Sequence, residues 1–425
     1  MTGRYLWVYL ILLLGSFRLF SQEKQTDSIT PFARIIVDTL ASPYMHGRGY
    51  YKNGDKLAAQ YIGTQFSGMR IDWKYQDLPF AINTFPKKLS VTLDGVALEC
   101  GKDFIADAST RSVKGKFLLV WVDSSVAVTL SSSKTFLASD FEGKALVIEH
   151  ENIFSKEIKD RLLSLARIVK SSLIIFADTK LTHSVSPELD PYPLIHIQKE
   201  KISRKNSYIS VNIRSKLVNN YSVRNVIAVV PGMFKDSFLV YSAHYDHLGR
   251  MGPEVYFPGA NDNASGIAML LAMARHYTKV ENRPKYSMVF IAFGGEEIGL
   301  VGSRYYVQNP TVPLNKIRFL VNLDILGTGE DGITVVNATQ HDREFKQLQK
   351  LNAQGDYLSQ VKSRGKAANS DHYWFSERGV PSFFIYTMGG IKAYHDVYDK
   401  RETLPLTKFN DLFKLLLDFN ASFGL

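Results

Sequence analysis

The spacing of apolar residues divides the chain into three parts, and the first part is helical. From about residue 29 to 72, apolar residues recur three and four positions apart, which is typical of helices that bury one face. The pattern predicts one helix in PFARIIVDTLAS and a second in GDKLAAQYIGTQFSGMRI. Between them, the Pro and Gly residues of SPYMHGRGYYKNG indicate a loop.

The second part, from about residue 86 to 216, consists mainly of short runs rich in β-branched and aromatic residues. These runs are KLSVTLDG, GKFLLVWVD, GKALVIEH, SSLIIFAD and YPLIHIQ. One helical stretch, SKEIKDRLLSLARIVKS, interrupts them. We therefore expect residues 86–216 to form a compact inserted domain that is β-rich or α+β.

The third part, residues 217–425, alternates between strand-like and helix-like segments. The predicted strands are RNVIAVVPG, DSFLVYSAHYD, YSMVFIAFGGEE, KIRFLVNLDILG and VPSFFIYT. The predicted helices are NASGIAMLLAMARHYTK, DREFKQLQKLNAQ and KFNDLFKLLLDFNAS. This alternation predicts an α/β domain with a mostly parallel central sheet flanked by helices. Residues 22–85 would be the N-terminal helical part of the same domain.

Residues 1–21 have the layout of a secretory signal peptide. A basic residue precedes an apolar core from Leu6 to Leu14, and a small residue, Ser21, marks the expected cleavage point. The core is shorter than the roughly 20 residues that a membrane span needs. We therefore predict an exported protein, periplasmic or extracellular, with no membrane span in its mature chain. Leu19 stands where a small residue is usual, so a retained N-terminal anchor is the alternative.

Charge and cysteine content narrow the possible partners. The chain has 51 Lys and Arg against 41 Asp and Glu, a formal net charge of +10. We find no basic helix and no Lys/Arg run interleaved with aromatic residues, so nucleic acid is not an expected partner. The single cysteine, Cys100, cannot form an intrachain disulfide, and we assign it no role.

Metal-binding types of side chain follow the predicted strands of the third part. They are His244 and Asp246 after SFLVYSA, Asp262 in PGANDNASG, Glu296 and Glu297 after VFIAFGG, Asp324 after FLVNL, and His395 in AYHDVYDK. Each alone has an ordinary interpretation, such as a helix cap or a surface histidine. Open α/β sheets, however, bind ligands at the carboxyl ends of their strands. Imidazole and carboxylate are also the groups that hold zinc in two-metal hydrolytic sites, so the whole set predicts a metal site.

The adjacent glutamates support this interpretation. Two ionised carboxylates side by side repel each other unless they are well solvated or face a cation. A shared metal removes the repulsion, because one glutamate can bind the metal while the other faces the metal-bound water. Asp246 lies two residues after His244, where it could accept the second ring N–H of a metal-binding histidine.

With these residues assembled, the chain resembles the dinuclear zinc exopeptidases of the bacterial leucyl aminopeptidase and aminopeptidase Y type. Glutamate carboxypeptidase and glutaminyl cyclase share the same core. The matching stretches, in order, are SAHYDHLG, PGANDNASGIA, FGGEEIGLVGS, NLDILG, SDHYWFSERGVPSFF and YHDVYDK. The stretch LASPYMHGRGYYKNGDKLAAQYI also resembles the opening helices and loop of the family.

The resemblance implies a role for each matching residue. Asp262 would bridge two zinc ions, one of them also bound by His244 and Asp324 and the other by Glu297 and His395. Glu296 would be the general base, and residues 86–216 would be a protease-associated (PA-like) domain that roofs the active site. Asp371 and His372, in SDHYWF, are further candidates near the site.

The sequence departs from the family pattern at two places. Asn263 follows the bridging residue where many members have a second Asp. The last motif reads His-Asp-Val-Tyr-Asp where the family commonly has His-Thr-Pro-x-Asp, which leaves the shape of that loop open.

The expected function is that of an exported zinc-dependent exopeptidase, an aminopeptidase that hydrolyses peptides through a water between two zinc ions. A glutaminyl cyclase with a single zinc and an inactive binding protein on the same fold are the alternatives. An aminopeptidase is favoured over a carboxypeptidase because no arginine cluster for a substrate carboxylate is obvious, although Arg304 and Arg364 could serve. The preferred side chain and the oligomeric state stay open.

Overall fold

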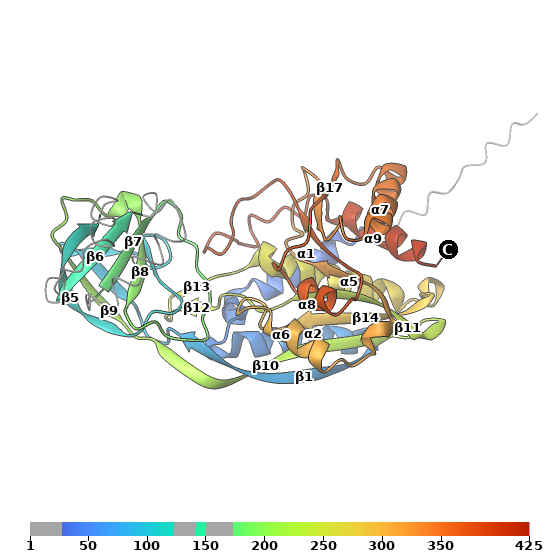
Figure 1. The fold of residues 1–425 in the computed structure, drawn as a ribbon, viewed down its shortest axis with the longest axis horizontal. Helices are drawn as coiled ribbons and strands as arrows, with labels where there is room; N and C mark the ends of the chain where they lie inside the picture. Colours follow the sequence, from blue (N-terminus) through green and yellow to red (C-terminus); the bar gives the residue numbers. More distant parts are fainter. Residues whose placement is uncertain (1–27, 123–141, 150–172, 425) are drawn as a thin grey trace, which may run out of the picture.

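Two β-sheets organise the protein in the computed structural model, which describes residues 28–122, 142–149 and 173–424. Figure 1 shows the larger sheet, with its helices, and the smaller, β-rich domain at opposite ends of the molecule. The predicted signal peptide and the predicted helix in SKEIKDRLLSLARIVKS lie outside the described residues.

The larger sheet has eight strands in the order β1-β10-β14-β11-β15-β18-β16-β17. Its strands are β1 (Asp72–Thr84), β10 (Lys216–Val230), β11 (Phe234–His244), β14 (Tyr286–Phe293), β15 (Ile317–Leu323), β16 (Ile333–Val336), β17 (Val361–Ser363) and β18 (Ser382–Thr387). The central strands β14, β11, β15 and β18 are parallel neighbours, whereas β1, β10 and β14 pair antiparallel, as do β18 and β16. The α/β prediction is confirmed, with a parallel centre inside a mixed sheet.

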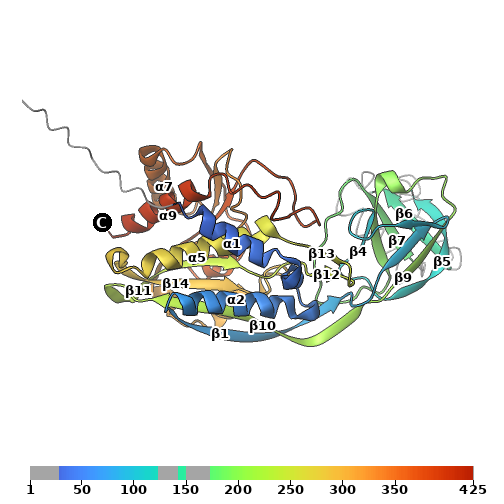
Figure 2. The same cartoon turned by 180° about the vertical axis from the view of Figure 1, so that it is seen from behind.

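Helices cover both faces of this sheet, which explains its continuous apolar strands. In β14, Met288 and Phe290 pack into one apolar cluster while Val289 and Ile291 pack into another on the opposite face. The first cluster contains residues of α1 (Thr30–Leu40), α2 (Gly54–Gly68), α5 (Gly266–Tyr277), α7 (Asp342–Gly355) and α9 (Phe409–Ser422). The second contains residues of α6 (Val301–Gln308) and α8 (His372–Glu377). Figure 2 shows α1, α2 and α5 lying across the first face.

Three strands of the larger sheet were not expected from the sequence. The edge strand β1 reads DWKYQDLPFAINT, in which polar and apolar residues are mixed and Pro79 interrupts the run. Proline is tolerated at a sheet edge, where its missing N–H costs no ladder bond, but it argues against a strand in the sequence. The short strands β16 and β17 carry too few residues to give a periodic signal.

The smaller sheet also has eight strands, in the order β3-β2-β9-β5-β6-β7-β8-β4. They are β2 (Ser90–Leu93), β3 (Val96–Leu98), β4 (Phe104–Ala106), β5 (Val113–Val122), β6 (Lys144–Glu149), β7 (Leu173–Asp178), β8 (Leu194–Gln198) and β9 (Tyr208–Ile213). β5 to β8 run parallel, and antiparallel strands complete both edges. We call residues 86–215 the β-rich domain.

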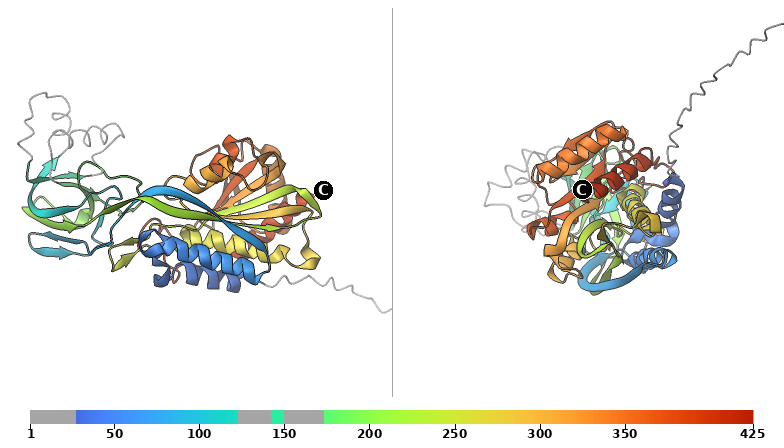
Figure 3. Two further views of the ribbon diagram at one scale, coloured as in Figure 1. Left: turned by 90° about the horizontal axis from the view of Figure 1, so that it is seen from below. Right: turned by 90° about the vertical axis from the view of Figure 1, so that its right-hand side faces the viewer.

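A long antiparallel ribbon of β1 and β10 connects the two sheets, pairing Asp72 with Val229 at one end and Thr84 with Lys216 at the other. Figure 3 shows this ribbon running from the larger sheet to the β-rich domain. Within the described residues, no helix combines the length and the apolar character that crossing a membrane requires.

Candidate metal centre

The predicted site residues meet where the parallel strands of the larger sheet end. His244 is the last residue of β11, Glu296 and Glu297 follow β14 after two glycines, and Asp324 directly follows β15. β11 lies between β14 and β15 and is parallel to both, so these ends share one edge of the sheet. Asp262 comes from the turn before α5.

Two histidines mark two separate positions in the site. His244 Nε2 lies 3.3 Å from an Asp324 oxygen and 3.4 Å from Oδ1 of Asp262. His395 Nε2 lies 3.1 Å from the other Asp262 oxygen, Oδ2, and 3.2 Å from Oε2 of Glu297. The structure thus brings together all five predicted metal ligands, with Asp262 between the two histidines.

These separations fit zinc. Ligand atoms about 2.0–2.1 Å from a tetrahedral zinc ion lie roughly 3.3 Å from one another. Among the described residues, two groups of potential ligand atoms lie within 4.8 Å of one another: His244 with Glu296 and Asp324, and His244 with Asp262 and Glu297. The four carboxylates of these groups would repel one another without a cation, so the donor set suits a divalent metal.

Main-chain carbonyl groups set the tautomer of both histidines. His244 Nδ1 lies 3.2 Å from the carbonyl oxygen of Asp246, and His395 Nδ1 lies 3.1 Å from that of His183. Because a carbonyl oxygen can only accept, each Nδ1 carries the proton and donates it. The Nε2 atoms that face the carboxylates are left free to bind a metal.

The Asp246 carboxylate has a different partner from the one the sequence suggested. Its nearer oxygen is 3.9 Å from His244 Nδ1, too far for a hydrogen bond, because the main-chain carbonyl takes that proton. The Asp246 carboxylate instead accepts hydrogen bonds from the backbone N–H groups of Glu296 (3.1 Å) and Glu297 (3.3 Å) and from the Tyr50 hydroxyl (2.9 Å). Asp246 therefore holds the turn that carries both glutamates.

The environments of the two glutamates push their pKa values apart. Burial raises the pKa of Glu296 well above its ordinary value; nearby His244 acts against this, but the charge of Glu297 adds to it. Burial also acts to raise the pKa of Glu297, but His395 and His247 outweigh it and hold that pKa well below its usual range. Such a division of pKa values is the pattern found where one carboxylate transfers protons and its neighbour stays charged.

Comparison with known proteins identifies the domain that contains this site. The model of peptidase family M28 matches residues 225–420. We call the larger sheet with its helices, which contains the matched residues, the M28 domain. The chain is 27% identical over 339 residues to aminopeptidase YwaD of Bacillus subtilis, covering 77% of this chain and 69% of that protein. It is 31% identical over 159 residues to leupeptin-inactivating enzyme 1 of Streptomyces exfoliatus, covering 37% of this chain and 34% of that enzyme.

Solved structures share the fold of the whole described chain. The zinc aminopeptidase BSAP from Bacillus subtilis superimposes with a TM-score of 0.69 at 21% identity, covering 92% of this chain and 94% of BSAP. The aminopeptidase from Aneurinibacillus sp. strain AM-1 gives a TM-score of 0.64 at 19% identity over 92% and 93% of the two chains. The fold of both parts of this chain thus occurs within single proteins of known structure.

Three buried residues of the M28 site were missed by the sequence analysis. His247 Nδ1 lies 2.6 Å from Oε1 of Glu297, on the side away from His395. Asp399 accepts hydrogen bonds from the backbone N–H groups of Asn261 (2.8 Å) and Asp262 (2.9 Å). The motif that contains His395 therefore also fixes the turn that carries Asp262. His247 and Asp399 both belong to quoted motifs, HYDHLG and HDVYD, but their partners lie on other segments, so the motifs alone gave no role for them.

The third missed residue, Arg48, has a fully buried guanidinium group. It donates to five main-chain carbonyl groups, those of Leu40, Tyr245, Pro258, Gly259 and Asp262. Burial lowers its pKa to about 10, while the nearby carboxylates of Asp262 and Asp399 act to raise it. Arg48 thus joins the N-terminal loop to both sides of the site.

Neighbouring polar residues hold the groups that face His244. Ser370, one residue before the candidate Asp371, donates its hydroxyl to Oδ2 of Asp324 at 2.9 Å. Asn263 donates to the carbonyl oxygen of Leu323 (2.9 Å) and accepts from the backbone of Gly266 (2.9 Å). An aspartate at position 263 could not make the first of these bonds, so the amide fits its place.

The two candidates near the site lie on either side of the start of α8. Asp371 is fully buried, and its charge is among the causes that raise the pKa of Glu296. His372 is also buried and packs its ring against Phe384, with centroids 5.4 Å apart. Burial raises the pKa of Asp371 to about 7, so it acts on the site through charge only when it is ionised, whereas His372 contributes packing.

A cavity of about 540 Å³ opens over the site and is lined by His244, Asp262, Glu296, Asp324 and His395 among others. Arg364 lies on its wall, 3.3 Å from the Tyr386 hydroxyl, to which it donates. Arg304 instead lies over the ring of Trp374, 5.9 Å from its centroid. Of the two arginines considered for a substrate carboxylate, the cavity therefore contains Arg364.

Proposed function

We propose that this protein is an exported aminopeptidase that binds two zinc ions and removes N-terminal residues from peptides. The observation that carries the proposal is the position of Asp262, whose two oxygens face two different histidines at 3.4 and 3.1 Å. One metal would be held by His244, Asp262 and Asp324, and the other by His395, Asp262 and Glu297.

The roles of the residues follow from their surroundings. Bound zinc ions polarise a carbonyl group and lower the pKa of water. Glu296, with its raised pKa and no place among the five ligands, would take a proton from the attacking water and give it to the leaving amine. Glu297 would stay ionised as a ligand, because His395 and His247 hold its pKa low.

Metal binding would displace protons from the site. The carboxylates of Glu297 and Asp262 raise the pKa of His395 to about 11, although burial acts to lower it. A metal at Nε2 must replace that proton, so zinc affinity should rise with pH.

The relatives support a peptidase and, among peptidases, an aminopeptidase. YwaD is named as an aminopeptidase, and 69% of its length is covered. The carboxypeptidase alternative would use Arg364 to bind the carboxylate of the substrate, a role that a single arginine on the cavity wall could fill. We also propose that the β-rich domain is the PA-like insertion of this family and that residues 1–21 direct export.

The central test is Glu296→Gln, with the exposed Glu281→Gln as a matched control. Zinc content and hydrolysis of aminoacyl anilides are measured for both variants and for the unmodified protein. We expect two zinc ions per chain throughout and about 10²–10⁴-fold slower turnover in Glu296→Gln alone.

The outcomes separate the alternatives. Turnover at the unmodified rate in Glu296→Gln would remove Glu296 from the mechanism. One zinc per chain together with cyclisation of N-terminal glutamine would favour a glutaminyl cyclase. Cleavage of N-blocked peptides at the C-terminus would favour a carboxypeptidase. Failure of the zinc-loaded protein on every substrate would favour a binding protein.

A further inference from the structure

The β-rich domain reaches the metal centre through a short segment that follows β7. The backbone N–H of His183 donates to the carbonyl oxygen of His395 at 2.8 Å, and the ring Nδ1 of His395 donates back to the carbonyl oxygen of His183 at 3.1 Å. One peptide segment of the β-rich domain therefore fixes both the main chain and the ring of a predicted metal ligand. The second of these bonds also selects the tautomer with a free Nε2.

Lys180 adds a second contact to the same loop. Its Nζ donates to the carbonyl oxygens of Lys392 (3.2 Å) and Tyr394 (3.3 Å) and pairs with Asp396 at 3.3 Å. The Asp396 side chain is only 10% exposed, so the pair is less screened than an ordinary surface pair. Tyr394 and Asp396 flank His395 directly and Lys392 lies three residues before it, so Lys180 ties this loop to the β-rich domain.

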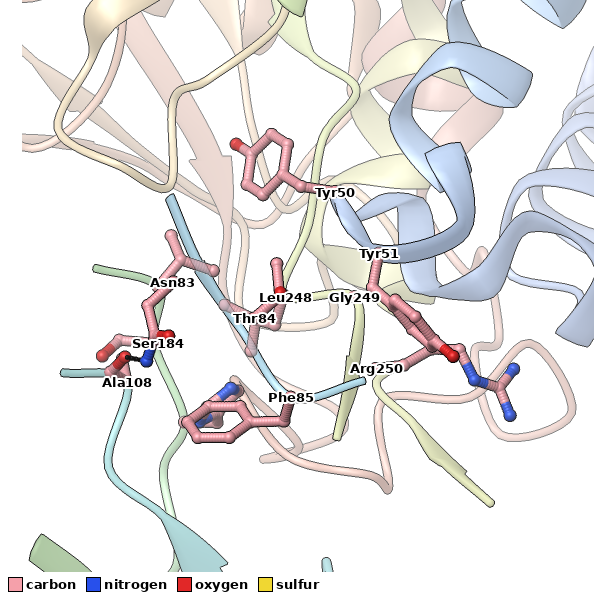
Figure 4. Close-up of a pocket in the computed structure, with 12 residues that line it drawn as sticks. Tyr50, Tyr51, Asn83, Thr84, Phe85, Ala108, Ser184, Leu248, Gly249 and Arg250 are labelled. Atoms are coloured by element: carbon pink, nitrogen blue, oxygen red, sulfur yellow. Dashed lines mark hydrogen bonds between the residues drawn. The ribbon is translucent and has the colours of Figure 1, made fainter. Parts of the chain in front are cut away.

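Apolar packing makes the junction stiff. The ring of His183 stacks on Phe257 with centroids 4.7 Å apart, and Phe257 and Val397 belong to the apolar cluster of the β-rich domain. The cavity at the junction measures only about 20 Å³, room for about one water. Figure 4 shows Phe85, Ser184 and Leu248 around it, drawn from both domains. Close packing of this kind leaves the 180–183 segment little freedom to shift alone.

The other histidine is anchored differently. His244 Nδ1 donates to the carbonyl oxygen of Asp246, a residue of its own strand end in the M28 domain. Asp324, the second residue of that ligand group, accepts from Ser370, also in the M28 domain. The two proposed metal positions therefore differ in what holds their ligands.

We infer that the 180–183 segment of the β-rich domain is a positioning element for His395, so that the zinc ion held by His395 and Glu297 depends on this domain and the ion held by His244 and Asp324 does not. The inference rests on the proposed two-zinc function. It makes the β-rich domain part of the metal centre, although it contributes no ligand.

The test is Lys180→Met in the full chain, which keeps the aliphatic stem and removes all three contacts to the 392–396 loop. Lys88→Met is the matched control, because the exposed pair of Lys88 with Glu254 (2.9 Å) also joins the two domains but has its partner outside the 392–396 loop. Zinc is added to the apoprotein in competition with a chromophoric chelator, which yields a stoichiometry and two dissociation constants.

We expect Lys180→Met to weaken one of the two zinc ions about 10-fold or more, the usual effect of losing a contact behind a ligand, and to leave the other unchanged. Excess zinc should restore kcat. Lys88→Met should match the unmodified protein. His183→Ala, which keeps the backbone bonds but removes the ring stack on Phe257, should show a smaller loss at the same ion and serves if Lys180→Met does not fold.

Equal weakening of both ions, or two unchanged constants in both Lys180→Met and His183→Ala, would overturn the inference. If the unmodified protein binds no zinc or one zinc, the proposed function fails instead, and the two failures are thereby distinguished.

Discussion

Replacing Asp246 by asparagine tests what this residue does in the site. Its Oδ1 accepts the backbone N–H of Glu296, and its Oδ2 accepts both the backbone N–H of Glu297 and the hydroxyl of Tyr50. Asparagine has a single acceptor oxygen, and its amide nitrogen cannot accept. In either orientation, one backbone N–H of the glutamate turn loses its acceptor, whereas the Tyr50 hydroxyl can reverse and accept from the amide.

The size of the effect follows from that one lost bond. A buried N–H without an acceptor costs about 1–3 kcal/mol, which corresponds to roughly 5- to 150-fold. Because the unpaired group moves the backbone under Glu296, we expect kcat to fall about 10–100-fold. The His244 ring N–H donates to the main-chain carbonyl of residue 246, which asparagine keeps, so zinc affinity should not change.

The assay measures kcat on an aminoacyl anilide, zinc dissociation constants by chelator competition, and the free energy of unfolding in urea. Tyr50→Phe is the control, because it removes the hydroxyl from Oδ2 but leaves both backbone bonds, and kcat should stay within a few-fold of the unmodified value. Loss of one zinc in Asp246→Asn, with kcat restored by excess zinc, would refute this reasoning and show that the carboxylate acts through His244.

Two further predictions concern stability. Arg48→Met removes one buried donor group from five main-chain carbonyl groups and should lower the free energy of unfolding by at least about 3 kcal/mol. Arg34→Met removes two carbonyl contacts at a half-buried position and should cost much less. Equal losses in the two variants would contradict this prediction. Burial acts to lower the pKa of His196, but Asp107 and Asp178 (3.2 and 2.6 Å) raise it from 6.5 to about 9. The raised pKa adds at most about 3 kcal/mol to the free energy of unfolding; this contribution is complete below pH 6.5 and is lost as the pH rises to about 9. Urea unfolding at several pH values measures it. A His196→Gln variant with the same pH dependence as the unmodified protein would refute the prediction.

The sequence was sufficient to predict which residues meet at the candidate site because of a geometric property of parallel sheets. A polar residue directly after an apolar run lies at the carboxyl end of a strand, and parallel neighbours place those ends together. His244, Glu297 and Asp324 follow three such runs, and the structure makes β11, β14 and β15 neighbours. The motif order then supplied Asp262 and His395, which lie on loops.

The contacts that position these ligands could not be predicted in the same way. Arg48 lies in a polar loop where a basic residue is usually solvated, and its partner Asp262 is 214 positions away. His183 acts through its main chain, so its side chain gives no signal for the bond to His395. The spacing of Asp246 and His244 predicts a bond between the carboxylate and the ring. The sequence cannot show that the main-chain carbonyl of Asp246 accepts that ring proton instead. Main-chain and long-range contacts are visible only after the chain has folded.

The two adjacent glutamates can have different roles only if the main chain between them is fixed. Asp246 accepts both of their backbone N–H groups, so the two side chains cannot exchange places by a small rotation of the turn. Glu297 then faces His247 and His395, which favour its charged form, whereas burial and neighbouring carboxylates disfavour the charged form of Glu296. One turn thus holds one carboxylate whose surroundings favour its charged form beside one whose surroundings disfavour it, as the proposed roles of ligand and general base require. This difference comes from the neighbours of each side chain, because the side chains themselves are identical.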